Sequence, residues 1–145
     1  MLRVTKLTDY ATVVLTVLAA RPGVVLSAPE LAECSGLEQP TVAKLLKPLA
    51  AAGLVQGFRG ASGGYRLAKS AESITLIEIV EAMEGPLSMT ECSAPNGHCG
   101  LETICGVRSN WRRINDVVIA ALRDVSLAQM RAPPESPALP RAAQA

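Results

Sequence analysis

The stretch LSAPELAECSGLEQPTVAKLLKPLAAAGLVQGFRGASGGYRLAK, residues 26–69, decides the fold. Near its start, Ser27 and Glu30 have the spacing of a capping box, in which each side chain bonds the other residue's backbone N–H. Pro29 suits the first turn of a helix, where its missing N–H costs nothing. We therefore expect a short helix that begins after Ser27 and ends before Gly36.

A second helix is expected from about Gln39 to Ala52, because apolar residues recur there at helical spacing. These apolar residues are Val42, Leu45, Leu46 and Leu49. Gly53 then provides a natural stop. Pro48 removes one backbone hydrogen bond inside this stretch, so we expect a bend near Lys47.

The rest of the stretch predicts a β-hairpin: LVQGFR is a strand, RGASGG a glycine-rich turn and YRLA the returning strand. Two short helices followed by a hairpin form the pattern of a winged helix-turn-helix, whose second helix enters the major groove of DNA. Lysine and glutamine can bond base edges there, and wing arginines suit the narrow minor groove. The alternative is a polar face that is merely solvated, or a protein-interaction module. The expected DNA-binding residues are Gln39, Pro40, Thr41, Lys44, Lys47, Arg59, Ser62 and Arg66.

Outside this stretch the pattern is mostly helical, so the expected fold class is mainly α. Residues 5–20 and 74–84 each have the apolar spacing of an amphipathic helix. Residues 88–107 lack periodicity and predict a loop, after which a long helix is expected from Asn110 to Met130. The last residues, 132–145, are rich in Pro and Ala and predict a disordered tail.

These elements divide the chain into a winged-helix DNA-binding part, residues 1–72, and a second part, residues 73–131. The second part would comprise a connector helix, a cluster-binding loop and a dimerisation helix. The apolar stripe from Trp111 to Leu127 is too extensive for an exposed helix and predicts a homodimer. A symmetric dimer would recognise a palindromic site in double-stranded DNA.

The composition narrows the classes of function. Hydrophobic residues make up 49% of the chain and aromatic residues 3%, so the core must be aliphatic, which favours helices. No apolar stretch reaches the roughly 20 residues of a membrane span, and we find no signal-peptide cleavage site, so we expect a cytoplasmic protein with no membrane partner. Residues 1–70 hold eight basic and four acidic residues, a weak indication of nucleic acid binding. We find neither a nucleotide-binding glycine fingerprint nor a CxxC pair, so we expect no enzyme and no small-molecule substrate.

Three cysteines, Cys92, Cys99 and Cys105, fall within one loop. Their six- and five-residue gaps are longer than those of most zinc knuckles and suit an iron–sulfur cluster. A zinc site that includes His98 is an alternative, as are free thiols or a peroxide-sensing pair. Cys34 is expected on the inward face of its helix, where a buried cysteine acts as a small hydrophobe.

Four segments together resemble the Rrf2 family of winged-helix transcription regulators, over residues 1 to about 130. They are LRVTKLTDYA, GLVQGFRGASGGYRLAK, ITLIEIVEAMEG and the loop with three cysteines. The regulators of the SUF system for iron–sulfur assembly are the most similar subgroup. The resemblance implies a homodimer through the long C-terminal helix, and a cluster bound by the three loop cysteines and one other ligand.

The resemblance also bears on that fourth ligand. IscR-like members use a histidine three residues after the last cysteine, but here that position is Arg108, which is no ligand. NsrR-like members use an aspartate from the partner's first helix, and Asp9 occupies the matching position. We expect Asp9, with His98 as the competitor, because an exchangeable carboxylate leaves the cluster labile. The alternative is that Asp9 only stabilises the helix dipole. The spacing does not fix the cluster type, and we expect 2Fe–2S rather than 4Fe–4S.

The implied function is repression of iron–sulfur cluster assembly genes, controlled by a bound cluster. The alternatives are a zinc- or thiol-based redox-responsive regulator of the same fold, or a nitric-oxide-sensing repressor.

Overall fold

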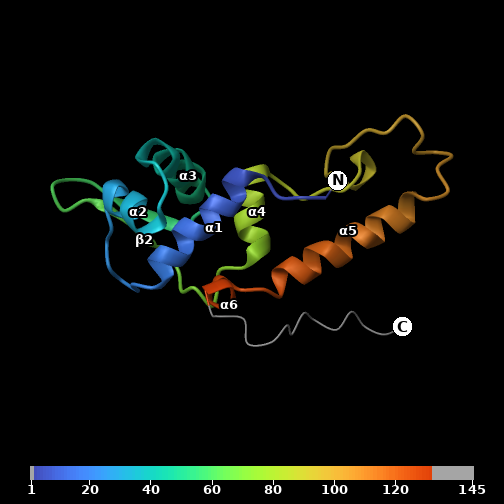
Figure 1. The fold of residues 1–145 in the computed structure, drawn as a ribbon. Coiled ribbons are helices and arrows are strands. Elements are labelled where there is room, and N and C mark those ends of the chain that lie inside the picture. Colours follow the sequence, from blue (N-terminus) through green and yellow to red (C-terminus); the bar gives the residue numbers. More distant parts are fainter. Residues whose placement is uncertain (1, 132–145) are drawn as a thin grey trace.

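The computed structural model describes residues 2–131, which form a small winged-helix body, a long loop and one long helix at the side of the body (Figure 1). The predicted tail, residues 132–145, lies outside this range. The elements in chain order are α1 (Lys6–Ala19), α2 (Ala28–Ser35), α3 (Gln39–Ala51), β1 (Val55–Phe58), β2 (Gly64–Leu67), α4 (Leu76–Glu84), the 3₁₀ turn η1 (Glu91–Ser93), α5 (Arg108–Arg123) and α6 (Leu127–Arg131).

The helix starts follow from local hydrogen bonds. The capping box predicted for α2 is present: the Ser27 N–H donates to Glu30 Oε2 at 2.7 Å, and the Glu30 N–H donates to Ser27 Oγ at 3.3 Å. Thr75 and Glu78 form a second capping box at the start of α4. Helix α3 continues through Pro48 to its last turn, so the proline does not shorten it, and the bend expected there stays a prediction.

An aliphatic core holds the winged helix together, as the composition predicts. It packs α1, α2, α3 and α4 against one another and against the base of the hairpin. The largest fully buried side chains are Leu15, Leu18, Leu31, Leu45, Leu46, Leu49, Leu54, Ile74, Ile79 and Leu127.

The predicted hairpin is confirmed, with β1 and β2 antiparallel and Gln56 opposite Arg66. Tyr65 also exchanges two backbone hydrogen bonds with Leu26, of 2.9 and 2.7 Å, so the hairpin is tied to the chain before α2. Gly64 lies at this contact, where a Cβ atom would overlap the Leu26 carbonyl group. The close approach of two backbones therefore requires glycine here.

The long helix predicted over residues 110–130 is wrong in its C-terminal part, because α5 ends at Arg123 and a separate helix, α6, follows. The chain between them pairs with residues 74–76, at the start of α4: the Leu76 N–H donates to Val125 O, and the Leu127 N–H to Ile74 O, each at 2.8 Å. Leu127 is fully buried in the core. These long-range bonds, and the burial of Leu127, end the helix where periodicity alone would continue it.

A local signal for the break is also present in the sequence. The Ser126 N–H donates to Gln129 Oε1 at 2.9 Å, and the Gln129 N–H donates to Ser126 Oγ at 3.2 Å. This reciprocal pair is a capping box of the Ser-x-x-Gln type, which starts a new helix at Leu127.

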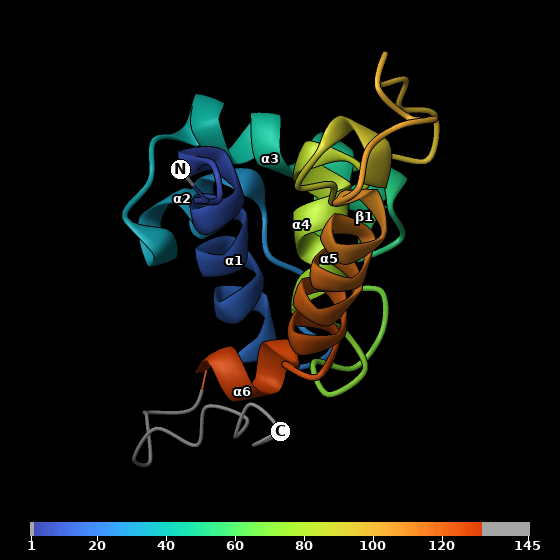
Figure 2. The same cartoon turned by 90° about the vertical axis from the view of Figure 1, so that its right-hand side faces the viewer.

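Helix α4 lies between α1 and α5, and α6 packs under the end of α1 (Figure 2). The body of the molecule and α5 are therefore connected twice, through α4 and through α6. Within residues 2–131, no helix is long and apolar enough to cross a membrane.

Candidate functional site

The N-terminal half of α3 presents the predicted recognition residues to solvent. Gln39, Pro40, Lys44 and Lys47 are exposed and Thr41 is half-buried, whereas the leucines of the same helix fill the core. Capping and packing of α2 fix the position of α3, because the two helices contact each other along their apolar sides. The exposed face of α3 is therefore available for a partner, as the sequence predicts for a recognition helix.

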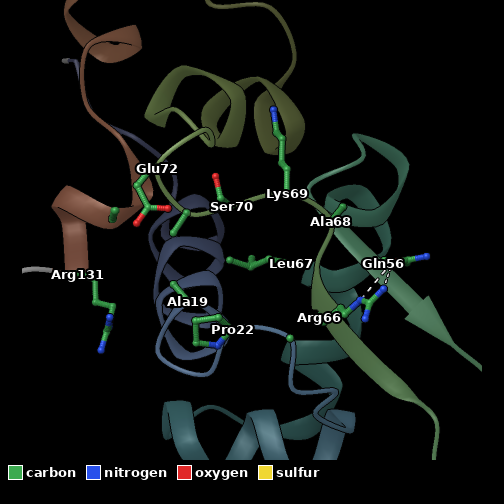
Figure 3. Close-up of a pocket in the computed structure, with 13 residues that line it drawn as sticks. Ala19, Pro22, Gln56, Arg66, Leu67, Ala68, Lys69, Ser70, Glu72 and Arg131 are labelled. Atoms are coloured by element: carbon green, nitrogen blue, oxygen red, sulfur yellow. Dashed lines mark hydrogen bonds between the residues drawn. The ribbon is translucent and has the colours of Figure 1, made fainter.

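The wing adds a second group of exposed residues. Arg59 and Ser62 lie in the turn between β1 and β2, and both are exposed. Arg66 differs, because its Nε and Nη2 donate to Gln56 Oε1 at 3.4 and 3.2 Å (Figure 3). Its guanidinium also lies 4.9 Å from the centre of the Phe58 ring. Gln56 and Phe58 are not predicted from the sequence; they share one face of the hairpin with Arg66, because Gln56 lies opposite Arg66 and side chains alternate along a strand.

A cavity of about 420 Å³ lies between the base of the hairpin, the end of α1 and α6 (Figure 3). Arg66, Lys69, Glu72 and Arg131 contribute charged side chains of both signs to its lining. Lys69 is already paired with Glu78. The cavity shares no lining residue with the cysteine loop, and its mixed charge favours no class of ligand.

One carboxylate joins α4 to the start of α1. Glu84 Oε1 accepts the Thr5 N–H at 2.7 Å and the Thr8 hydroxyl at 2.6 Å. The bond from the Thr8 hydroxyl, followed by that from the Thr5 N–H, lowers the pKa of Glu84 below its ordinary value. Asp9, the predicted fourth cluster ligand, follows Thr8 and is exposed. The last residue of α4 thus fixes the turn of α1 that carries Asp9.

Side chains of α5 hold the start of the cysteine loop. Asn115 is 4% exposed; its Oδ1 accepts the Met89 N–H at 2.9 Å, and its Nδ2 donates to Leu87 O at 3.4 Å. Arg112 Nε donates to Cys92 O at 3.1 Å. The backbone from Leu87 to the first loop cysteine is therefore bound to one face of α5.

The three loop cysteines are free thiols, each half-buried. Cys92 Sγ lies 3.1 Å from Thr90 Oγ1, and the Cys99 N–H donates to Glu102 Oε1 at 3.1 Å. The bond from Cys99, and then the nearby positive charge of Arg108, lowers the pKa of Glu102. In the part of the chain that the structure describes, no three ligand-type side chains lie close enough together to hold a metal ion. His98 is exposed.

Arg108 is the first residue of α5 and follows Cys105 by three positions. Its Nε atom is buried and has no hydrogen-bond partner within the described range 2–131. Helix α5 has Val107 at its N-cap, with no side-chain cap, and no acidic residue in its first turn. A buried donor without an acceptor costs about 1–3 kcal/mol, so a partner at this position is expected.

The prediction that Cys34 is buried is wrong, because its side chain is exposed. The inward face of α2 is formed by Leu31, with Ala28, Ala32 and Ser35 partly buried around it. Cys34 points away from this face, and Arg21 Nη1 lies 3.2 Å from its sulfur. The sequence pattern predicted Cys34 on the inward side of this short helix, whereas the next residue, Ser35, lies there.

Comparisons with known proteins agree with this geometry. The profile of the family described as "Rrf2: Iron-dependent Transcriptional regulator" matches residues 4–133. The HTH-type transcriptional regulator NsrR of Bacillus subtilis is 31% identical over 123 residues, which cover 83% of this chain and 82% of that protein.

Two solved structures are also similar. The global cysteine regulator CymR of B. subtilis has a TM-score of 0.70 and 30% identity, over 90% of this chain and 97% of that chain. The IscR of T. potens has a TM-score of 0.66 and 28% identity, over 89% of this chain and 85% of that chain.

Proposed function

The chain belongs to the Rrf2 family of transcriptional regulators, and from this premise we propose that it represses iron–sulfur cluster assembly genes and senses through a bound iron–sulfur cluster. It is a regulator and not an enzyme. The observation that carries the proposal is the loop with three free thiols, whose first cysteine is bound to α5 through Arg112. The matching family is described as iron-dependent, so a loop with three thiols would serve as its iron-binding site.

The residues of the loop fit a cluster in their chemistry. Cys92, Cys99 and Cys105 supply three thiols, the ligands that iron–sulfur clusters prefer, and Asp9 of a second subunit would supply the fourth ligand. When bound, the cluster supplies a redox-active group that is sensitive to oxidation and to ligand loss. We expect a 2Fe–2S cluster. Thr90, Glu102 and Arg112 would hold the backbone and side chains of the cysteines in place.

The exposed face of α5 supports the second subunit in this proposal. Trp111, Ile114 and Val117 are 38%, 43% and 62% exposed, although they lie on one helix. Apolar side chains that are this exposed on one face usually mark an interface. A symmetric pairing through α5 would place two copies of α3 for the two halves of a palindromic DNA operator.

The connections of α5 to the winged helix give a route for control. Helix α5 contacts α4, whose Glu84 binds the start of α1, and α5 continues into α6, which packs on α1. A change in the cysteine loop would thus alter the position of α5 relative to α1, and with it the separation of the two recognition helices. A sensor acts by shifting the equilibrium between two such positions of α5 relative to α1.

The test is to purify the protein without oxygen, record its absorption spectrum and assay iron and sulfide. We expect a coloured protein with iron and sulfide in similar amounts. Replacing Cys92, Cys99 and Cys105 together by Ala should remove the visible absorption, whereas Cys34→Ala, the matched control, should not. A triple variant that still contains iron and sulfide in wild-type amounts would show that the cluster is not bound by this loop.

A second candidate is regulation by thiol oxidation without a cluster. The observation that favours it is the exposed sulfur of Cys34 next to Arg21, together with three partly exposed loop thiols. In that case the anaerobic protein would be colourless, and peroxide would change its DNA affinity in a Cys-dependent way.

A further inference from the structure

Three side chains contact one another on the exposed face of the hairpin. Arg66 of β2 lies directly opposite Gln56 of β1, and its Nε and Nη2 both donate to Gln56 Oε1, at 3.4 and 3.2 Å (Figure 3). The same guanidinium lies 4.9 Å from the centre of the Phe58 ring, within the range of a cation–π contact. Phe58 is two residues beyond Gln56 and is therefore the diagonal neighbour of Arg66. We call Gln56, Phe58 and Arg66 the wing triad.

The wing triad supplies a contact that the last pair of the hairpin lacks. Phe58 is the last residue of β1 and lies opposite Gly64, where a Cβ atom would overlap the Leu26 carbonyl group. Contacts between opposite side chains stabilise a pair of strands, and a glycine contributes none. Arg66, two residues further along β2, contacts the Phe58 ring instead. The end of β1 is thus held to β2 by the side chain of Arg66.

The residue that follows Phe58 is Arg59, the first residue of the wing turn, residues 59–63. Inside this turn the Gly63 N–H donates to Gly60 O at 3.0 Å. The two glycines give the turn a wide range of backbone conformations. The direction in which Arg59 leaves the hairpin therefore depends on how firmly the end of β1 is held.

We propose that the wing triad fixes the end of β1 before DNA binds, and that Arg66 thereby positions Arg59 for a DNA groove instead of contacting DNA itself. Arg66 is among the residues expected to bind DNA, and this inference gives it a positioning role. Its Nε and Nη2 already donate within the hairpin. A wing that is ordered in advance loses less conformational entropy on binding, so the affinity is higher. The inference rests on the docking of the wing on DNA in the proposed function, and it does not depend on the iron–sulfur cluster.

The first test uses the free protein and nuclear magnetic resonance. Phe58 is the only phenylalanine of the chain, so labelled phenylalanine identifies its ring signals without ambiguity. We expect the ring current of Phe58 to shift the Hδ and Hε protons of Arg66, and this shift to disappear in Phe58→Leu. The side-chain protons of Arg113, an exposed residue of α5, should be the same in both proteins. Equal Arg66 shifts in wild type and Phe58→Leu would overturn the proposal.

The second test measures DNA affinity by fluorescence anisotropy, with a duplex that the wild-type protein selects from a random-sequence pool. Phe58→Leu removes the ring without changing any charge, and it should weaken binding by about fivefold. In an Arg59→Ala background the same substitution should leave the affinity nearly unchanged, because the side chain that the triad positions is absent. In a Lys44→Ala background it should cost as much as in wild type, since Lys44 lies on α3 and not on the wing.

Substitutions of Arg66 distinguish positioning from direct contact. Arg66→Lys retains the charge over the ring but loses the forked bonds to Gln56, so its affinity should lie between those of wild type and Arg66→Gln. In the Arg59→Ala background, Arg66→Gln should leave the slope of log affinity against log salt concentration nearly unchanged. A slope that becomes less steep by about one would show that Arg66 itself contacts a phosphate, and it would overturn the positioning role.

The outcomes separate this inference from the proposed function. If Arg59→Ala binds the duplex as tightly as wild type, the wing does not dock as proposed and the positioning role is refuted with it. If Phe58→Leu costs the same in wild type and in Arg59→Ala, the docking stands and only the positioning role is refuted. Circular dichroism checks that each variant folds, and Gln56→Ala replaces Phe58→Leu in the same comparison if the latter does not. A protein without iron and sulfide would refute the iron–sulfur cluster but would leave both tests in force.

Discussion

Glu84 Oε1 accepts a hydrogen bond of 2.6 Å from the hydroxyl of Thr8, although 76 residues separate the two in the sequence. Thr8 is 2% exposed and lies in the first turn of α1, and Glu84 is the last residue of α4. The same carboxylate oxygen accepts the Thr5 N–H at 2.7 Å. A negative charge at the start of α1 also complements the helix dipole. The cysteine loop begins directly after this contact, so the contact connects the proposed sensor to the winged helix.

Glu84→Gln should lower the free energy of unfolding at pH 7 by about 1 kcal/mol or less, because the side chain is exposed and its bonds compete with water. The pKa of Glu84 is below its ordinary value of 4.5 in the folded protein. Its contribution is therefore fully present above pH 4.5 and is lost as the pH falls through the lowered, folded-state pKa. Urea denaturation at several pH values measures the difference between the variant and wild type.

The matched control is Glu81→Gln, an exposed residue of the same helix. It should leave the stability at pH 7 nearly unchanged. A Glu84→Gln deficit that is as large at pH 3 as at pH 7 would contradict the role of the ionised carboxylate.

Gly64→Ala should destabilise the winged helix by about 1–3 kcal/mol, because a new Cβ would overlap the Leu26 carbonyl and force the backbones apart. Operator binding should weaken as well, since the hairpin carries Arg59. Gly106→Ala is the control, as its Cβ would meet no atom within 4 Å. Thermal unfolding and fluorescence anisotropy with operator DNA measure the two effects, and equal stability of both variants would refute the close approach.

Lys44→Ala and Arg59→Ala should each weaken operator binding by about 1–3 kcal/mol if the side chain contacts a base. If it contacts only phosphate, the loss should be similar for all DNA sequences, and the salt dependence should become less steep. Binding is measured by anisotropy at several salt concentrations. Arg123→Ala, at the far end of α5, is the control. Unchanged affinity and salt dependence in both test variants would reject the docking through α3 and the wing.

Ile114→Asp and Val117→Asp should give a monomer at micromolar concentration, because each places a charge in the apolar face of α5 that we assign to the dimer. Light scattering after gel filtration measures the mass. Arg113→Asp changes an exposed charge on the same helix and should leave the dimer intact. A monomeric wild-type protein would be the contrary result.

Asp9→Ala should leave a cluster bound by three thiolates that has a shifted spectrum and a shorter lifetime in air. His98→Ala, the competing ligand, should change neither. Because Asp9 would bind the cluster of the other subunit, a dimer of one Asp9→Ala chain and one Cys92→Ala chain should contain one complete site. Absorption spectra and decay rates measure both effects; a labile His98→Ala cluster beside a normal Asp9→Ala cluster would reverse the assignment.

Local sequence signals determined most of the fold. The capping box of Ser27 and Glu30, the helical spacing of the leucines in α3 and the glycine-rich hairpin turn act between residues close in the chain, so they can be recognised without a structure. The same holds for the three loop cysteines, whose residue type and spacing suggest their chemistry. The predicted DNA-binding residues of α3 lie at the surface, since the apolar pattern of a helix also identifies its polar side.

The tertiary structure alone decided the features that depend on distant partners. The start of α6 has a local signal in the Ser126–Gln129 capping box, but where α6 lies depends on the bonds of the Leu76 N–H to Val125 O and of the Leu127 N–H to Ile74 O. The Thr8–Glu84 contact likewise joins residues far apart in the chain. The exposure of Cys34, and the lack of a hydrogen-bond partner for Arg108 Nε among residues 2–131, likewise depend on what packs around them. Spacing along the chain specifies which side chains share a face of one element. It does not specify which other element covers that face, because that is decided by packing of the whole core.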